Sequence, residues 1–171
     1  MFEQKVPRFM SEFGFQSYPS LKTLSGWFDE KDLNYDSHIL QNHQKHPKGN
    51  ELIEKYMTRD YFVPENFADF IYVSQLLQAE GITRGIEAHR RAMPYCMGSL
   101  YWQLNDCWPV VSWSGIDYEG RWKALQYFAK KSFEPVILSL EINDETLNIY
   151  LVNDKNEWAE GYLTFQLMNF E

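Results

Sequence analysis

One carboxylate, Glu12, stands in the stretch RFMSEFGFQSYPS, residues 8–20, which is otherwise mostly apolar, aromatic or small. With Phe9, Met10 and Phe13 as near neighbours, it is expected to be largely buried. A buried charge without a partner costs several kcal/mol, so it normally has a partner or a chemical task. The residues alone leave three roles open for Glu12: a nucleophile, a general acid, or half of a structural ion pair with an arginine.

A second group with chemical potential is found in GSLYWQLNDCW, where Trp102 is followed by Gln103, Asn105 and Asp106. An indole face beside a carboxylate suits a pyranose ring. The C–H groups of the sugar stack on the indole, and a nearby negative charge stabilises an oxocarbenium-like transition state. The alternative for Trp102 is plain packing inside a barrel.

The elements that must position these residues follow the order of a parallel α/β fold. Residues 5–15 are apolar on both parities, which predicts a short strand covered on both faces. A long helix is predicted from Pro64, then a second strand in PYCMGSLYWQLND, then a helix in RWKALQYFAKKSF. Carboxyl ends of neighbouring barrel strands lie close together, so Glu12 and Trp102 are expected to face one pocket.

The tail changes character after Pro135. VILSLEI, TLNIYLV and GYLTFQLMNF alternate in polarity and are separated by turn residues, which predicts antiparallel strands that begin a β-sandwich. We therefore predict an α/β fold with two domains. Residues 1–134 form the last two βα units of a TIM (β/α)8 barrel, and residues 135–171 begin an immunoglobulin-like β-sandwich. A full barrel needs about 250 residues, so the chain is expected to be a slice of a larger protein.

Composition narrows the classes of partner. The 171 residues are 44% hydrophobic and 23% charged, and the formal net charge is −8. Without a cluster of Lys and Arg, an acidic chain is not expected to bind nucleic acid or an anionic membrane. Aromatic residues make up 17% of the chain, which favours a flat, partly apolar ligand such as a sugar. No glycine-rich phosphate loop occurs, so no cofactor is expected.

Histidines and cysteines receive simple interpretations. His38, His43 and His46 match no metal-ligand spacing, and we predict an exposed loop rather than a metal site. Cys96 and Cys107 lie eleven positions apart, too far to bridge along a strand that rises about 3.3 Å per residue. Two free thiols are expected.

SEFGFQS and WQLNDCWP, in this order and about ninety residues apart, resemble the C-terminal part of the catalytic barrel of β-mannosidases of glycoside hydrolase family 2. The resemblance continues through FEPVILSLE into the following sandwich domain. It implies that Glu12 is the catalytic nucleophile and that Trp102 lines the subsite of the sugar being cleaved. We predict Trp102, Asn105 and Asp106 as substrate-binding residues, with β-mannosides and manno-oligosaccharides as ligands.

The resemblance also implies a retaining exo-enzyme that removes terminal non-reducing β-D-mannose. Such an enzyme needs a second carboxyl group about 5–5.5 Å from the nucleophile. In the family this group belongs to an NE pair upstream of SEFG, so the rest of a parent chain is expected to complete the barrel and the 171-residue chain alone is expected to be inactive. Two other functions stay open: a non-catalytic carbohydrate-binding module, or another family 2 glycosidase (exo-glucosaminidase, β-galactosidase or β-glucuronidase). The residues do not indicate a localisation.

Overall fold

A computed structural model describes residues 5–143, 145–166 and 168–169, and the chain divides into two units, Met1–Phe133 and Glu134–Glu171. In chain order the first unit contains β1 (Met10–Phe13), α1 (Leu21–Trp27), the 3-10 helix η1 (Glu30–Asp32), α2 (His38–Asn42), α3 (Gly49–Asp60), α4 (Phe67–Arg91), β2 (Ser99–Tyr101) and α5 (Ala124–Ser132). The second unit contains β3 (Val136–Asn143) and β4 (Thr146–Asn153). The chain is thus a mixed segment of helices and strands.

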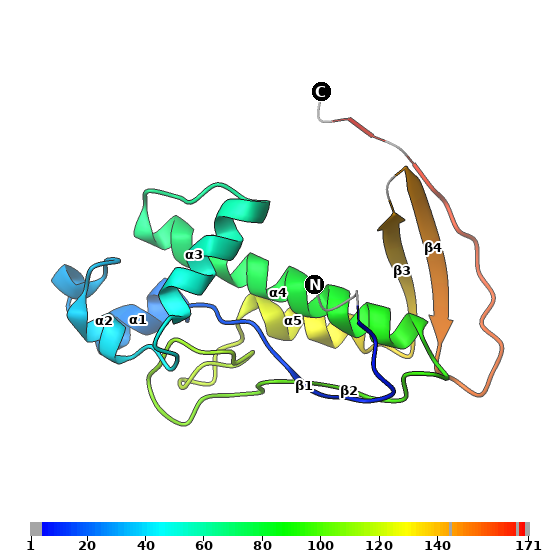
Figure 1. The fold of residues 1–171 in the computed structure, drawn as a ribbon, viewed down its shortest axis with the longest axis horizontal. Coiled ribbons are helices and arrows are strands. Elements are labelled where there is room, and N and C mark those ends of the chain that lie inside the picture. Colours follow the sequence, from blue (N-terminus) through cyan, green and yellow to red (C-terminus); the bar gives the residue numbers. More distant parts are fainter. Residues whose placement is uncertain (1–4, 144, 167, 170–171) are drawn as a thin grey trace. The chain divides into compact units, whose positions relative to one another are not determined.

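Strands β1 and β2 pair in parallel, with Met10 opposite Ser99 and Phe13 opposite Tyr101. Both strands run toward the side of the unit where α1, α2 and α3 lie (Figure 1). The predicted order of strand, helix, strand and helix is found, although β2 is only three residues long.

Two apolar clusters hold the first unit together. Phe13 of β1 packs on α4 and α5, which lie side by side in Figure 1. The members of this cluster are Phe13, Ile82, Ile86, Leu125 and Ala129. The second cluster joins α1, α2 and α3 to the first half of α4, and its buried members are Tyr18, Leu24, Leu40, Ile53, Met57, Phe70, Ile71, Leu77 and Val111. Burying a side chain of this size contributes about 1.5–3 kcal/mol, so these clusters fix the layer of helices beneath the strands.

Helix α4 forms as the sequence predicts and continues through Gly81 without a break. The Asn66 side chain caps its first turn by accepting hydrogen bonds from the backbone N–H groups of Ala68 and Asp69 (2.8 and 3.3 Å). Cationic Arg90 and Arg91 lie in the last turn, where the helix dipole favours positive charge.

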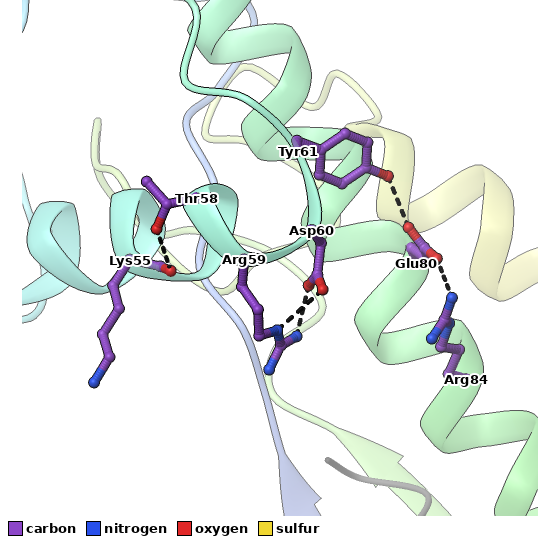
Figure 2. A network of polar contacts seen from close by, with 7 residues as sticks. All are labelled: Lys55, Thr58, Arg59, Asp60, Tyr61, Glu80 and Arg84. Atoms are coloured by element: carbon purple, nitrogen blue, oxygen red, sulfur yellow. Dashed lines mark hydrogen bonds and ion pairs between the residues drawn. The ribbon is translucent and has the colours of Figure 1, made fainter. Parts of the chain in front are cut away.

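A polar network joins the end of α3 to α4 (Figure 2). The Arg59 guanidinium holds the Asp60 carboxylate with two hydrogen bonds (3.0 and 2.6 Å), and the Tyr61 hydroxyl donates to Glu80 (2.7 Å). Glu80 also accepts from Arg84 one turn along α4. Burial, with the hydrogen bond to Glu80, raises the pKa of Tyr61 to about 12, so Tyr61 stays a hydrogen-bond donor at neutral pH. Exposed ion pairs of this kind add at most about 1 kcal/mol, so the network orients the junction more than it stabilises it.

Gln78 of α4 connects the helix layer to the segments that follow β1 and β2. Its side chain is fully buried, and its amide nitrogen donates to the backbone carbonyls of Phe15 (2.7 Å) and Trp113 (3.1 Å). Its amide oxygen accepts from the Ser17 hydroxyl (2.7 Å). One side chain thus provides hydrogen bonds to backbone groups of both segments.

Replacing Gln78 with Met, which has a similar shape but no amide, is expected to lower the free energy of unfolding by about 2–4 kcal/mol, because the Phe15 carbonyl and the Ser17 hydroxyl lose the hydrogen bonds that Gln78 provides. Thermal and denaturant unfolding of the 171-residue chain measure this change. Gln41→Met on the exposed face of α2 is the matched control, with an expected change within about 0.5 kcal/mol. Equal losses in the two variants would contradict this role for Gln78.

The second unit is a regular antiparallel hairpin in which Val136 pairs with Asn153 and Asn143 with Thr146. One face is apolar and carries Leu138, Leu140, Ile142, Leu147, Ile149 and Leu151. The other face is more polar: it carries the pair of Ile137 and Val152 at one end, and beyond it the Glu141 carboxylate accepts from the Tyr150 hydroxyl (3.0 Å).

Two expectations about the strands are wrong. Ser11 and Glu12 are exposed, because among the described residues only α4 and α5 cover the β1–β2 pair, and they cover one face. The described residues of 161–170 form no strand, and residues 167 and 170 lie outside the described part. A strand forms only where its backbone pairs with another strand, and the described residues of this segment belong to neither of the two sheets.

Candidate active site

Glu12 and Trp102 lie at the carboxyl ends of the two paired strands. Phe13 is opposite Tyr101, and the Trp102 backbone N–H donates to the Phe13 carbonyl (2.8 Å). Phe13 and Tyr101 face the helices, so the alternation of side chains along a strand puts Glu12 and Trp102 on the opposite face. Both are exposed there, Trp102 by 46%. The two residues singled out by type are therefore neighbours on one open face.

Gly14 allows β1 to approach the residues that follow β2. A Cβ atom at this position would lie 2.4 Å from the Trp102 carbonyl oxygen and 3.0 Å from Cδ1 of Trp113. Backbone does not yield at such distances, so only glycine fits here. The glycine after Glu12 thus sets how closely the Glu12 strand and Trp102 can lie.

The segment after Trp102 is held by a buried carboxylate. Asp106 accepts hydrogen bonds from the hydroxyl groups of Ser112 (2.8 and 2.9 Å) and Ser114 (2.5 Å). It also accepts from the Gln103 side-chain amide (3.2 Å), which donates to the Asn105 carbonyl as well (2.9 Å). Asp106 is only 6% exposed, so its carboxylate serves this loop, while Asn105 is exposed.

Asp117, in the loop between β2 and α5, is also a buried carboxylate that holds its own segment, as Asp106 does. Its carboxylate accepts from the Thr23 hydroxyl (2.6 Å) and from the backbone N–H groups of Glu119 (3.0 Å) and Arg121 (2.9 Å). Gly120 completes this turn with a φ of 76°, a conformation that glycine adopts without strain. With 2% exposure, Asp117 is placed to hold the turn rather than to transfer a proton to a ligand.

His89 supports the strand pair from the helix side. One ring nitrogen, Nδ1, is 2.7 Å from the Ser99 hydroxyl, and the ring meets the edge of Phe13 at 5.2 Å between centroids. Burial lowers the pKa of His89, which favours the neutral ring at neutral pH. The layer below Glu12 and Trp102 is therefore uncharged at this point.

The three clustered histidines are not equally exposed, contrary to the expectation of a solvated loop. His38 is exposed, but His43 is half-buried, with Nδ1 2.6 Å from the Pro109 carbonyl and its ring against Phe28. His46 is half-buried as well. Nowhere in the described ranges do three or more His, Cys, Asp or Glu side chains gather in a way that could hold a metal ion. Cys96 and Cys107 are free thiols, as predicted.

Two residues of this region are not indicated by motif reasoning. Gln78 could have been found, since a polar residue on the apolar stripe of a long helix normally has a buried partner. Lys123 gives no such signal, because a single lysine before a helix is normally exposed.

Of the helices in the described ranges, none is long and apolar enough to cross a membrane.

Comparison with curated proteins shows extended similarity to β-mannosidases. The chain is 35% identical over 160 residues to the β-mannosidase of Capra hircus, a match that covers 86% of this chain and 18% of that protein. It is 36% identical over 190 residues to β-mannosidase A of Aspergillus terreus, covering 96% of this chain and 20% of that protein. The chain thus spans about a fifth of the length of these relatives. No family model matches the chain.

Comparison with solved structures also shows similarity to a β-mannosidase. The crystal structure of the β-D-mannosidase from Dictyoglomus thermophilum superposes with a TM-score of 0.88 at 36% identity, covering 91% of this chain and 19% of that one. The exo-chitosanase of Amycolatopsis orientalis shares the fold, with a TM-score of 0.64, 22% identity, and 77% and 17% of the two chains covered. Over most of its own length, the chain is a homologue of one segment of β-mannosidases.

Proposed function

We propose that this homologue of a β-mannosidase segment is part of a retaining exo-β-mannosidase of glycoside hydrolase family 2. Glu12 is its nucleophile, and Trp102 is the platform for the sugar that is cleaved. The observation that carries the proposal is the placement of both residues on the open face of β1 and β2, at the carboxyl ends of paired parallel strands. Active sites of parallel α/β folds lie at this end of the strands.

The proposed reaction has two displacements. The Glu12 carboxylate attacks the anomeric carbon of a terminal β-D-mannose, the bond to the aglycone oxygen breaks, and an acid protonates the leaving oxygen. Water then attacks the anomeric carbon of the glycosyl-enzyme, and the residue that served as the acid now accepts the proton of this water. Mannose is released with retained configuration. The indole of Trp102 holds the ring through its C–H face, and its π-electrons favour the positive charge that develops in the transition state.

The acid and base is proposed to come from another part of a longer parent chain. Asp106 and Asp117 are poor candidates, because both are buried and their oxygens accept hydrogen bonds from Ser112, Ser114 and Thr23. The chain spans about a fifth of its relatives, which leaves room for an upstream carboxyl group.

The same proposal interprets the two units as parts of larger domains. We assign residues 1–134 to the last two βα units of a TIM barrel, with α4 and α5 outside the strands and Glu12 facing the barrel interior. We assign residues 135–171 to the start of a β-sandwich. The one-sided apolar face of the β3–β4 hairpin supports this assignment, since such a face normally packs on a second sheet.

A carbohydrate-binding module is a weaker alternative. That function would have Glu12 in a salt bridge and tryptophans on a flat outer surface. Among the described residues, ion pairs within 4.0 Å join Lys31 to Asp29, Arg59 to Asp60 and Arg84 to Glu80, and Glu12 takes part in none of them. Glu12 is thus an exposed carboxylate beside Trp102, which fits a reacting group better than a structural one.

The 171-residue chain alone is expected to give no measurable hydrolysis of 4-nitrophenyl β-mannoside, because a retaining glycosidase needs both carboxyl groups. The longer protein that carries this chain is expected to release nitrophenol and mannose, with the β-anomer formed first by NMR. Turnover by the chain alone would contradict the missing acid. Inactivity of the longer protein on β-mannosides, or activity on a β-glucosaminide instead, would contradict the proposed substrate.

A further inference from the structure

Lys123, just before α5, has its charged group inside the protein. The residue is 2% exposed, and its Nζ donates to the backbone carbonyls of Ser17 (3.1 Å) and Ser112 (3.3 Å). Lysine is rarely buried to this extent, because its ammonium group loses its water shell. A lysine that stays buried despite this cost in free energy is expected to have a structural or functional role.

The two carbonyls belong to different segments that meet at this point. Ser17 follows β1 and lies five residues after Glu12, and Ser112 lies ten residues after Trp102. The Ser17 backbone N–H donates to the Ser112 carbonyl (3.0 Å), so the segments already touch through one hydrogen bond. The Lys123 ammonium group donates to both carbonyls at once, so it links the two segments to each other and to the start of α5.

Buried carboxylates accompany the ammonium group. Burial lowers the pKa of Lys123 to about 7, and the charges of Asp106 and Asp117 act in the opposite direction. Asp106 is hydrogen-bonded to Ser112, one of the two residues that Lys123 contacts, and Asp117 is hydrogen-bonded to Thr23 of α1. When all three groups are ionised, Lys123, Asp106 and Asp117 together carry one net negative charge, so removing the lysine alone would leave the two buried carboxylates without this cation.

We propose that Lys123 is a positioning residue of the sugar site, whose side chain clasps the segment after Glu12 to the segment after Trp102. This inference rests on the function proposed above. A shift of Ser112 moves Asp106, which holds Gln103 beside Trp102, and a shift of Ser17 moves the end of β1. Displacing reacting groups by about 1 Å can cost about 100-fold in rate.

The test uses Lys123→Met in the longer protein, with 4-nitrophenyl β-mannoside as substrate. A 2-deoxy-2-fluoro-β-mannosyl fluoride, which accumulates the glycosyl-enzyme, counts the active sites, so kcat is expressed per working site. The assay is run at a temperature below the melting temperature of the variant. We expect its kcat/KM per site to be about 10- to 100-fold lower than that of the wild type. Lys130→Met, on the exposed side of α5, is the matched control and should match the wild type.

A merely structural lysine would give a different result. Lys123→Met would then lower the melting temperature and the number of active sites but leave kcat/KM per site at the wild-type value, and this outcome would overturn the inference. A wild type without activity on β-mannosides would instead overturn the proposed function, and the inference with it. The two failures are thus distinguishable.

A second variant covers the case in which Lys123→Met does not fold. Lys123→Met combined with Asp117→Asn keeps the cluster at one net negative charge, and Asp117→Asn alone is its comparison. The double variant is expected to fold and to have about tenfold lower kcat/KM per site than Asp117→Asn. Equal values in these two proteins would show that the site does not need the clasp.

Discussion

Replacing Glu12 with Gln in the longer protein should lower kcat for β-mannoside hydrolysis by about 10⁴- to 10⁶-fold, the usual cost of removing a catalytic nucleophile. The amide has nearly the same shape but neither attacks the anomeric carbon nor stabilises a developing cation. Because Glu12 is exposed and outside the apolar clusters, the melting temperature of the 171-residue chain should change by little. Nitrophenol release under saturating substrate measures the loss.

Two controls separate a nucleophile from a structural carboxylate. Glu65→Gln, at an exposed carboxylate before α4, should leave kcat unchanged. Glu12→Ala leaves space beside the anomeric carbon, where added azide can attack and displace an activated aglycone. The expected product is α-mannosyl azide, with inverted configuration because only one displacement has occurred. A Glu12→Gln enzyme with more than about a tenth of wild-type kcat would remove Glu12 from the proposed role.

The order of helices and strands could be predicted from the sequence because most of the signals that set it are local. The periodic apolar positions of α4 and α5 act within a few residues, and both helices form where the sequence predicts them. The parallel pairing of β1 with β2 follows from the long helix between them, since parallel strands need such a crossover.

What the sequence could not supply depends on contacts between distant segments. The exposure of Glu12 is decided by what covers β1, and in the described residues nothing covers that face. The absence of a strand in the described residues of 161–170 has the same origin, since alternating polarity does not provide a hydrogen-bonding partner. The burial of Lys123 arises from residues more than a hundred positions away, such as Ser17.

The candidate site shows the same division. Glu12 and Trp102 could be selected because their types are unusual for their surroundings, and the structure puts both on one face of the strand pair. Asp106 was selected on the same grounds, yet its carboxylate is bound to Ser112 and Ser114. A carboxylate type alone does not tell a ligand-binding group from one that holds a loop, since both need hydrogen-bond donors nearby. Contact of Asp106 with a substrate stays a prediction.

Replacing Trp102 with Ala should lower kcat/KM for β-mannosides about 30- to 100-fold, the second-largest effect expected at this site. An indole that covers about 100 Å² of sugar contributes about 2–3 kcal/mol, and the loss should exceed the rise in KM because the ring also stabilises a positive transition state. Trp102→Phe should recover part of the rate. Trp158→Ala, at a tryptophan that is 99% exposed in the second unit, is the matched control and should have no effect. If Trp102 only packs within the barrel, Trp102→Ala will lower the melting temperature while kcat/KM per active site stays at the wild-type value, whereas a sugar platform predicts the reverse pattern.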